Sequence, residues 1–293
     1  MGQHRLREIT ILSGKGGAGK TSLSASLLPW LDSPVLADCD VDAPDFDILL
    51  SPELEESRDF QGAQKARIDP EHCSQCGVCM QHCRFDAIDH IQGVHYVDPH
   101  SCEGCGVCAF VCPHNAVDLK PAVVGTVNRS KTPYGTLIHG KLIPGEEASG
   151  KLVSEVRKSA RELAVAQNAG LIIVDGPPGI GCPAISSITG TDHVVLVTEP
   201  SPSGFHDLKR LAEVVSRFAL PMTLVINKWD LDAPLAEQIQ RFAEEQNIPV
   251  SMKIPFHRGI VDSILQRHIP SLGMKEEYEE WGMEQLIHAL KEG

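Results

Sequence analysis

The chain has 293 residues, of which 42% are hydrophobic and 22% are charged. This composition allows a normal buried core over about two domains and excludes a wholly disordered chain. No apolar run approaches the roughly 20 residues that cross a bilayer, and the N-terminus shows no secretory apolar segment. The formal net charge of −13 disfavours non-specific binding to nucleic acid. We therefore expect a cytoplasmic protein with no membrane and no nucleic acid among its partners.

A glycine-rich loop follows the first predicted strand. Residues 9–12 form an apolar run, the sequence SGKGGAGKT spans residues 13–21, and residues 22–28 favour a helix. Strand, glycine-rich loop and helix in this order are the context of a phosphate-binding loop, whose amides and helix N-terminus surround phosphate groups. We expect Lys20 to contact the β- and γ-phosphates and the Thr21 hydroxyl to bind Mg²⁺. The predicted nucleotide-binding residues of the loop are Gly14, Lys15, Gly16, Gly17, Ala18, Gly19, Lys20, Thr21 and Ser22.

The second predicted strand ends in acidic residues. Residues 35–37 are apolar and lead directly to Asp38 and Asp40. Carboxylates at the carboxyl end of a strand can bind Mg²⁺ or its waters, or orient the water that attacks a phosphate. We expect Asp40 to orient the attacking water and Asp38 to lie near the metal, although these two roles could be exchanged.

One cysteine pattern then occurs twice. Its spacing is C-x2-C-x2-C-x3-C, and each cysteine of the second copy lies 29 residues after its counterpart (102 − 73). In the bacterial ferredoxin pattern, three clustered thiolates hold one [4Fe-4S] cluster and the fourth binds the other cluster. We therefore expect the first cluster on Cys73, Cys76, Cys79 and Cys112. We expect the second cluster on Cys83, Cys102, Cys105 and Cys108.

Zinc and disulfides are weaker interpretations of the same cysteines. A third cysteine three residues after the second would crowd a tetrahedral zinc site, and nothing in the sequence indicates an oxidising compartment. The copies differ in one expected feature, because Pro113 follows Cys112 whereas Arg84 follows Cys83. This difference changes the surroundings of the second cluster without removing a ligand.

Predicted strands and helices alternate along the rest of the chain. The strands lie at 8–12, 35–37, 171–174, 193–198, 222–226 and 250–254, and the helices at 152–167, 203–218, 235–246 and 260–267. This alternation predicts an α/β fold, with a parallel sheet covered by helices on both faces. We expect a P-loop domain made of residues 1–62 and 122–293, and an inserted ferredoxin-like domain at 63–121. Residues 123–150 are expected to form a hairpin and 274–290 a single packed helix.

The glycine-rich loop resembles a particular class of P-loop. Lys15 is a second lysine ahead of Lys20, and the sequence K-G-G-A-G-K-T is similar to the deviant Walker A loop of the MinD/ParA and nitrogenase iron-protein superfamily, which includes Mrp-type ATPases. The resemblance implies an ATP-sandwich dimer in which Lys15 reaches the partner subunit's nucleotide, as an arginine finger does. It also implies that residues 171–179 are Walker B and switch II, with Asp175 near Mg²⁺. The catalytic residues would then be Lys15, Lys20 and Asp40.

Three further residues have two interpretations each. Asn227 and Lys228 begin an N-K-W-D sequence that resembles the base-contacting motif of GTPases. Because the equivalent asparagine of the MinD group contacts adenine, ATP is the expected nucleotide, although Asn227 could be only a turn residue. Cys182 lies seven residues after Asp175 (182 − 175), which is similar to a cluster-ligating cysteine of the nitrogenase iron protein. Packing is the expected role for both Cys182 and Cys39, and ligation or transfer of a cluster is the alternative for Cys182.

The expected function is therefore that of an Mg²⁺-dependent ATPase that couples nucleotide-driven dimer closure to electron transfer through two [4Fe-4S] clusters. The alternatives are an iron–sulfur cluster or metal carrier of the Mrp type, and a MinD/ParA-like spatial organiser with a redox-sensing ferredoxin domain. Two complete cysteine motifs favour electron transfer, because a fully coordinated cluster is hard to release. The expected partners are a second copy or a paralogue, together with an unidentified redox or cluster-accepting protein.

Overall fold

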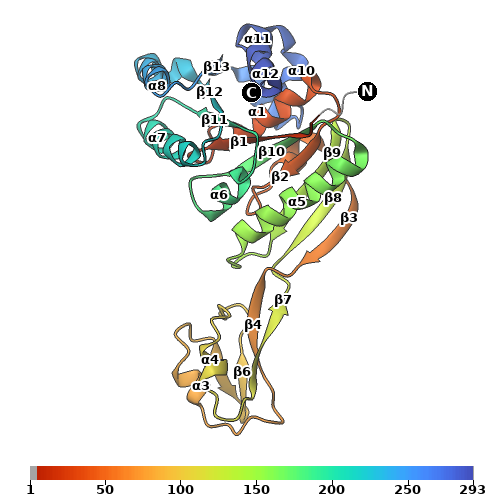
Figure 1. Cartoon of the computed structure of the whole chain (residues 1–293), viewed down its shortest axis with the longest axis vertical. Coiled ribbons are helices and arrows are strands. Elements are labelled where there is room, and N and C mark those ends of the chain that lie inside the picture. Colours follow the sequence, from red (N-terminus) through yellow and green to blue (C-terminus); the bar gives the residue numbers. More distant parts are fainter. Residues whose placement is uncertain (1–4, 293) are drawn as a thin grey trace. The chain divides into compact units, whose positions relative to one another are not determined.

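The computed structural model describes residues 5–292, which fold into two compact units (Figure 1). Unit 1 contains Val127–Lys141 and the described residues of Met1–Ser57 and Ser149–Gly293. Unit 2 contains Arg58–Thr126 and Leu142–Ala148. The sequence predicts the inserted domain at 63–121. Unit 2 extends beyond both of these bounds, and it also includes the later segment Leu142–Ala148. Lys65 and Glu146 form an ion pair at 2.9 Å that ties this later segment to unit 2.

Unit 1 is built on a nine-stranded sheet with the order β13-β12-β11-β1-β10-β2-β9-β8-β3. In chain order its strands are β1 Arg7–Ser13, β2 Val35–Asp38, β3 Glu53–Phe60, β8 Gly125–Thr132, β9 Gly135–Leu142, β10 Leu171–Pro178, β11 His193–Thr198, β12 Met222–Asn227 and β13 Val250–Ile254. Neighbouring strands from β13 to β9 pair in parallel. The predicted α/β fold with a mostly parallel sheet is confirmed. The expected hairpin is formed by β8 and β9, which extend this sheet.

Successive side chains of each strand point to opposite faces of the sheet, so the strands supply two separate cores. Ile11 belongs to one core and Leu12 to the other. The first face is covered by α1 Lys20–Leu27, α2 Phe46–Leu50, α9 Arg258–Leu265, α10 Pro270–Gly273, α11 Lys275–Glu280 and α12 Met283–Glu292. The second face is covered by α5 Ser149–Gln167, α6 Cys182–Ile188, α7 Pro202–Arg217 and α8 Ala233–Glu245. Each valine, leucine, isoleucine, phenylalanine or methionine side chain fully buried in these cores contributes about 1.5–3 kcal/mol.

The C-terminal segment forms two helices, α11 and α12, so the prediction of a single helix over 274–290 is wrong. Gly282 lies between them with a φ of 110°. A Cβ atom at Gly282 would lie 2.4 Å from the carbonyl oxygen of Ser251 on β13. The chain therefore needs a glycine to pass this strand, and its backbone conformation ends the helix. Local periodicity could not show this, because the cause is a tertiary contact.

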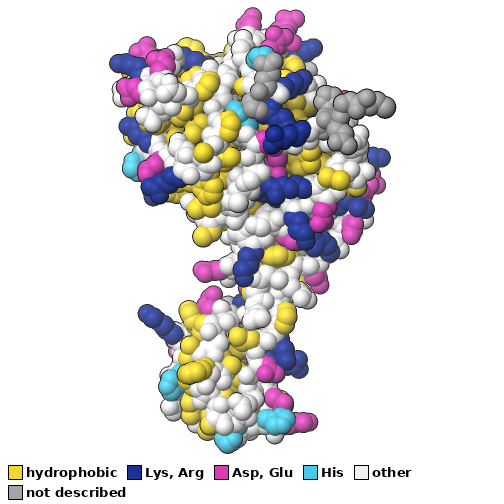
Figure 2. All heavy atoms as spheres, viewed as in Figure 1, with side chains coloured by type: hydrophobic (Ala, Val, Ile, Leu, Met, Phe, Trp, Pro, Cys, Tyr) yellow, Lys and Arg dark blue, Asp and Glu magenta, His cyan; other side chains and the backbone are white. Residues whose placement is uncertain are grey.

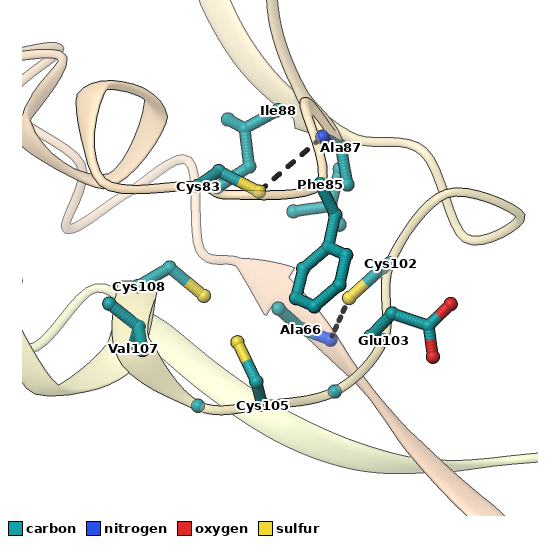
Figure 3. Close-up of a pocket in the computed structure, with 13 residues that line it drawn as sticks. Ala66, Cys83, Phe85, Ala87, Ile88, Cys102, Glu103, Cys105, Val107 and Cys108 are labelled. Atoms are coloured by element: carbon teal, nitrogen blue, oxygen red, sulfur yellow. Dashed lines mark hydrogen bonds between the residues drawn. The ribbon is translucent and has the colours of Figure 1, made fainter.

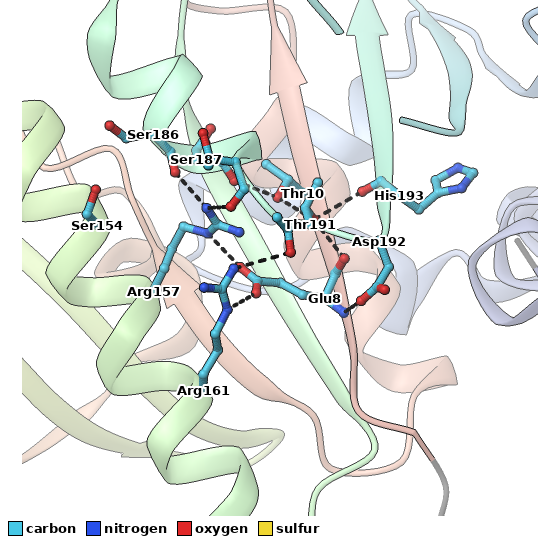
Figure 4. A network of polar contacts seen from close by, with 12 residues as sticks. Glu8, Thr10, Ser154, Arg157, Arg161, Ser186, Ser187, Thr191, Asp192 and His193 are labelled. Atoms are coloured by element: carbon cyan, nitrogen blue, oxygen red, sulfur yellow. Dashed lines mark hydrogen bonds and ion pairs between the residues drawn. The ribbon is translucent and has the colours of Figure 1, made fainter. Parts of the chain in front are cut away.

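A buried ion network joins β1, α5 and α6 (Figure 4). Glu8 on β1 accepts hydrogen bonds from Arg157, at 2.5 Å, and from Arg161, both on α5. Arg157 also donates to the carbonyl oxygens of Ser186 and Thr189 at 2.6 and 2.8 Å. Because Glu8 and Arg157 are buried, loss of either partner would leave an uncompensated charge and cost about 3–5 kcal/mol. The network thus holds β1, α5 and α6 together, and the glycine-rich loop follows the other end of β1.

Unit 2 contains two small antiparallel sheets and two short helices. Strand β4 Ala63–Ile68 pairs with β7 Val117–Ala122, strand β5 Ile88–Ile91 pairs with β6 Val94–Val97, and the helices are α3 Val78–Gln81 and α4 Val107–Phe110. The internal repeat is visible in the backbone, because each helix follows a left-handed glycine, Gly77 with φ 74° and Gly106 with φ 79°. Five apolar residues and two cysteines make up the buried core of this unit: Ala66, Cys79, Ala87, Ile88, Val97, Cys102 and Val117.

Hydrophobic side chains are exposed on both units. On the face drawn in Figure 2, acidic and basic side chains are interspersed with them over unit 1. The large hydrophobic residues that unit 2 exposes are Met80, Phe85, Ile91, Val94, Tyr96, Val107, Phe110, Val123 and Ile143. Within residues 5–292, no helix combines the length and the apolar character needed to span a membrane.

Candidate functional site

The predicted phosphate-binding loop connects β1 to α1 at the carboxyl end of a central strand. Gly17 and Gly19 have φ angles of 79° and 93°, a left-handed conformation that favours glycine. A Cβ atom at Gly14 would lie 2.4 Å from Cβ of Asp207, and one at Gly19 would lie 2.2 Å from the side-chain nitrogen of Asn227. The loop therefore combines glycine-dependent turns with close neighbours on two sides. This is the geometry that lets backbone amides surround a phosphate.

Lys20, Thr21 and Ser24 all contact Asp175, at the carboxyl end of β10. The Lys20 ammonium donates to this carboxylate at 3.0 Å, and both hydroxyls donate to it at 2.7 Å. Burial alone would lower the pKa of Lys20, but the attraction of Asp175 and Asp38 outweighs burial and raises that pKa. Lys20 therefore keeps its charge in the buried site. The fold brings together the loop lysine, the predicted metal-binding threonine and the predicted Walker B aspartate.

Asp38 and Asp40 lie beside this cluster because β2 pairs with β10. Asp38 faces Asp175 in the strand register, and it accepts the backbone amides of Asp40 at 3.1 Å and Phe46 at 3.3 Å. Burial and the charge of Asp175 raise the pKa of Asp38 well above its ordinary value. Asp40 is more open to solvent and lies 3.9 Å from Lys20, and burial raises its pKa to about 6. These surroundings favour Asp40 for orienting water, while Asp38, beside Asp175 in the sheet, keeps its expected place near the metal.

Lys15 is held within its own chain by Glu199. Its Nζ atom lies 2.8 Å from the Glu199 carboxylate and 2.9 Å from the Ser201 hydroxyl. The same carboxylate pairs with Lys228 at 2.9 Å. Burial alone would raise the pKa of Glu199, but its hydrogen bonds to Lys15 and Lys228 outweigh burial and lower that pKa. One carboxylate thus holds two of the predicted nucleotide-binding lysines.

Asn227 and Lys228 also contact the backbone of the loop. The Asn227 amide donates to the carbonyl oxygen of Ala18 at 2.8 Å, and Lys228 donates to that of Gly17 at 3.1 Å. Through these contacts, the end of β12 supports the phosphate-binding loop. The adenine contact expected for Asn227 stays a prediction.

Sequence reasoning missed Ser24 and Glu199. Ser24 lies four residues after Lys20 on α1 (24 − 20), so both side chains share one face of the helix, and this spacing could have been noticed. Glu199 follows β11, which lies next to β1 in the sheet. Its position beside Lys15 depends on strand order, which the sequence does not state directly.

The cysteine side chains of unit 2 surround two cavities. The first thiol cavity is lined by Cys73, Cys76, Cys79 and Cys112 and encloses about 310 Å³, part of it open solvent. The second thiol cavity, drawn in Figure 3, is lined by Cys83, Cys102, Cys105 and Cys108 and encloses about 340 Å³, again partly open. Each cavity takes three cysteines from one copy of the repeat and the fourth from the other. This is the same grouping that the sequence predicts.

Backbone amides are directed at three of the cysteine sulfur atoms. The contacts run from Ala66 to Cys102 at 3.4 Å, from Ala87 to Cys83 at 3.4 Å and from Ala116 to Cys112 at 3.3 Å. Such N–H donors stabilise thiolates, and hydrogen bonds to sulfur tune iron–sulfur clusters. Four thiols, amide donors and apolar walls form a donor set that fits a [4Fe-4S] cluster in each cavity.

A single zinc ion is the alternative metal for the same thiols. Within the described residues, no three His, Cys, Asp or Glu side chains are placed to hold a single ion. A structural zinc site needs four ligands that converge on one point at about 2.3 Å. In a [4Fe-4S] cluster each thiolate binds a different iron atom, so the sulfur atoms surround a cavity instead. Which metal occupies the two cavities stays a prediction, with [4Fe-4S] clusters as the expected occupants.

The two remaining cysteines lie in unit 1. Cys39 is fully buried, and burial raises the pKa of its thiol well above the ordinary value, so it packs as a small apolar side chain as expected. Cys182 is exposed at the first residue of α6. This exposure contradicts its interpretation as a packing residue.

Residues 9–270 match the family described as the CobQ/CobB/MinD/ParA nucleotide binding domain. The chain is 36% identical over 226 residues to the uncharacterized protein MJ0578 of Methanocaldococcus jannaschii. This alignment covers 76% of this chain and 78% of that protein. It is 27% identical over 283 residues to the uncharacterized protein MJ0579 of the same organism, covering 87% of each.

Solved structures of MinD proteins share the fold. The cell division ATPase MinD of Pyrococcus furiosus superposes with a TM-score of 0.56 and 19% identity, covering 97% of this chain and 98% of that one. A chain of the MinC:MinD cell division protein complex of Aquifex aeolicus gives 0.57 and 16%, covering 98% and 96%. At such identities the likeness shows the fold alone. The predicted resemblance to MinD/ParA ATPases is confirmed, and the ferredoxin-like identity of unit 2 stays a prediction.

Proposed function

This chain belongs to the family of CobQ/CobB/MinD/ParA nucleotide-binding domains, and from that membership we propose that it couples ATP-driven dimer closure to electron transfer through two [4Fe-4S] clusters. The observation that carries the proposal is the combination, in one chain, of a phosphate-binding loop and two cavities that are each lined by four cysteine thiols. Neither part alone would distinguish this protein from a simple nucleotide switch or a simple electron carrier.

ATP binding is assigned to the cluster around Lys20. This buried, positively charged side chain lies on the loop and exchanges its contact with Asp175 for the β- and γ-phosphates. Thr21 and Asp175, with Asp38 close by, would hold Mg²⁺, and this ion would supply positive charge to the phosphate oxygens. Asp40, which is more exposed than Asp38, orients the attacking water. A solved MinD of Pyrococcus horikoshii is complexed with Mg-ADP, which supports this use of the fold.

Dimer closure is assigned to Lys15. A lysine that acts on a partner's nucleotide has to leave its own chain, so its ion pair with Glu199 must open. The opening is compensated when the ammonium reaches the charge of the partner's γ-phosphate, as an arginine finger does. The partner is a second copy or a paralogue. MJ0578 and MJ0579 come from one organism, which supports the possibility of a paralogous pair.

Electron transfer is assigned to the two thiol cavities. A [4Fe-4S] cluster supplies reversible acceptance of one electron. Each cavity offers a complete set of four thiols, which favours keeping a cluster over donating it. Phe85 lines the second thiol cavity and is 42% exposed, and Phe110 on α4 is 91% exposed. Aromatic side chains are enriched in protein interfaces, so the surroundings of these two residues are suited to contact with a redox partner protein.

Iron analysis of anaerobically purified protein tests the assignment. We expect about eight iron atoms per chain, four for each cluster, and an electron paramagnetic resonance signal after reduction. ATP hydrolysis should require Mg²⁺ and should be lost on Lys20→Ala, which removes the loop charge. Iron close to four atoms per chain, or one equivalent of zinc in its place, would contradict the two-cluster proposal. Rapid release of iron to an apo-protein acceptor would favour the Mrp-type carrier.

A further inference from the structure

The internal repeat relates the two thiol cavities residue by residue. Shifting the lining of one cavity by 29 residues (102 − 73) reproduces most of the other: Cys73 becomes Cys102, Gly77 becomes Gly106 and Ala116 becomes Ala87. The departures from this correspondence show how the two sites differ. One of them is buried, because His95 lines the first thiol cavity where its counterpart in the second is Ala66.

A second departure from the repeat contacts the first. Gln75 corresponds to Gly104, and the two residues have nearly the same left-handed backbone, with φ angles of 60° and 64°. The Gln75 side-chain oxygen accepts the backbone amide of His95 at 3.1 Å and lies 2.6 Å from its Nδ1 atom. Gln75 and His95, which both differ from their counterparts in the second copy of the repeat, are thus hydrogen-bonded to each other beside the first thiol cavity.

Gln75 occupies a conformation that a glycine would adopt more easily. A residue with a side chain in a sparsely populated backbone region costs of the order of 1–3 kcal/mol and persists where the surroundings require it. The second copy uses glycine at this position, where a Cβ would lie 2.0 Å from the carbonyl oxygen of Gln64. The first copy retains glutamine, and its side chain orients His95. A functional role of the Gln75–His95 pair explains why this copy keeps a strained backbone at Gln75.

The contacts also fix which nitrogen of His95 carries the proton. An amide oxygen can only accept, so Nδ1 donates to Gln75 and a neutral ring leaves Nε2 as the lone-pair nitrogen. Nε2 is the atom closest to the open side of Gly77, 3.8 Å from where a Cβ would be. Gly77 lies between two cysteines of the first thiol cavity. The negative end of the imidazole dipole therefore faces the loop that would hold the first cluster.

Reduction adds one negative charge to a cluster. Inside a protein, a fixed dipole acts on that charge more strongly than it would in water, and the potential of a cluster depends on such neighbours. A lone-pair nitrogen in the wall of the first site opposes reduction there, whereas the methyl group of Ala66 at the second site does not. His114, which replaces Phe85 in the first cavity, is exposed, so solvent weakens its influence.

We propose that His95, positioned by Gln75, makes the two clusters unequal and the first cluster the harder one to reduce. This proposal rests on the proposed function, since it requires both clusters to be present. Electrons that enter unit 2 then settle on the second cluster. His95 acts on the first cluster through its dipole and does not bind iron.

Redox titrations followed by electron paramagnetic resonance at pH 8.5, where histidine side chains are ordinarily neutral, test the proposal. The parent protein should show two distinct one-electron potentials. His95→Ala, which gives the first site the residue of the second, should raise only the lower potential. We expect the ratio of reduced to oxidised first cluster at a fixed potential to rise roughly tenfold, which is about 59 mV for a one-electron couple. The control is His90→Ala, because the His90 ring is tilted against that of His95, with 4.8 Å between the ring centroids, but His90 does not line either cavity.

Gln75→Gly provides a second, independent variant. It installs the residue of the other copy, releases the ring of His95 and relieves the left-handed strain, so the lower potential should again rise while thermal stability does not fall. If both variants keep the iron content of the parent and leave both potentials unchanged, the proposal is wrong while the two-cluster assignment stands. If both variants lose the first cluster, His95 serves to retain the cluster and not to set its potential, and the proposal is also wrong. A parent protein without clusters would overturn this proposal together with the proposed function.

Discussion

Lys15→Ala should slow ATP turnover by about 10³-fold or more while leaving nucleotide binding nearly unchanged, because a positive charge supplied to a partner's γ-phosphate has that magnitude of effect. Lys15 differs in position from Lys20. Its ammonium lies in a partly exposed ion pair with Glu199, whereas the Lys20 ammonium is buried against Asp175. Only the exposed lysine is placed to leave the chain. Closure of the dimer with Mg²⁺ and ATP should weaken in parallel with turnover.

Sedimentation, nucleotide binding and steady-state turnover separate the roles of these two lysines. Lys20→Ala is the contrasting variant and should lose binding itself. Glu199→Gln is the matched control for the ion pair, because it keeps the size of the side chain while removing the charge that holds Lys15. It should therefore ease closure instead of weakening it. If Lys15→Ala dimerises and hydrolyses ATP like the parent, the action of Lys15 across the interface is refuted.

Cys112→Ser should remove about four of the eight expected iron atoms, and the cluster lost should be the one bound by the first cysteine motif. Cys112 belongs to the second motif in the sequence, yet it lines the first thiol cavity with Cys73, Cys76 and Cys79. Cys83 shows the reverse arrangement in the second cavity. Serine is close to cysteine in size, so the change tests ligation more than packing.

Double variants make the crossing of the ligand sets measurable. Cys76→Ser combined with Cys112→Ser removes two ligands of one cavity, so about four iron atoms should remain. Cys76→Ser combined with Cys83→Ser removes one ligand from each cavity, so nearly all iron should be lost. The opposite outcome, with iron retained in the second pair and lost in the first, would show that each motif binds its own cluster. Iron analysis and reduced-state spectra of the anaerobically purified variants distinguish the two cases.

The parts of the molecule that sequence could predict are those with short-range causes. The strand β1, the glycine-rich loop and the helix α1 form one continuous segment whose residue types require a particular backbone. The grouping of the eight cysteines was predicted because both copies match the bacterial ferredoxin pattern, in which the fourth thiolate binds the other cluster. Asp175 was predicted because residues 171–179 resemble the Walker B and switch II segments of MinD-type ATPases.

The parts that were missed depend on contacts between distant segments. Glu199 reaches Lys15 only because β11 lies next to β1 in the sheet. The charged strand β3 is exposed along its length and has no apolar alternation to reveal that it pairs at the edge of the sheet. His95 and Gln75 each read as an ordinary loop or hairpin residue until the fold brings them to one cavity. Comparison of the two repeat copies, position by position, could have identified this pair as a difference.

The measurement that most directly tests the coupling of ATP to electron transfer is a redox titration of the clusters with and without a non-hydrolysable ATP analogue. Asp40→Ala, which removes the carboxylate assigned to water orientation, provides a second way to hold the ATP-bound state. Nucleotide-driven closure should shift at least one cluster potential, and linkage requires reduction to change ATP affinity by the same free energy. Equal potentials in both nucleotide states, together with an ATP affinity that does not respond to reduction, would contradict the proposed function.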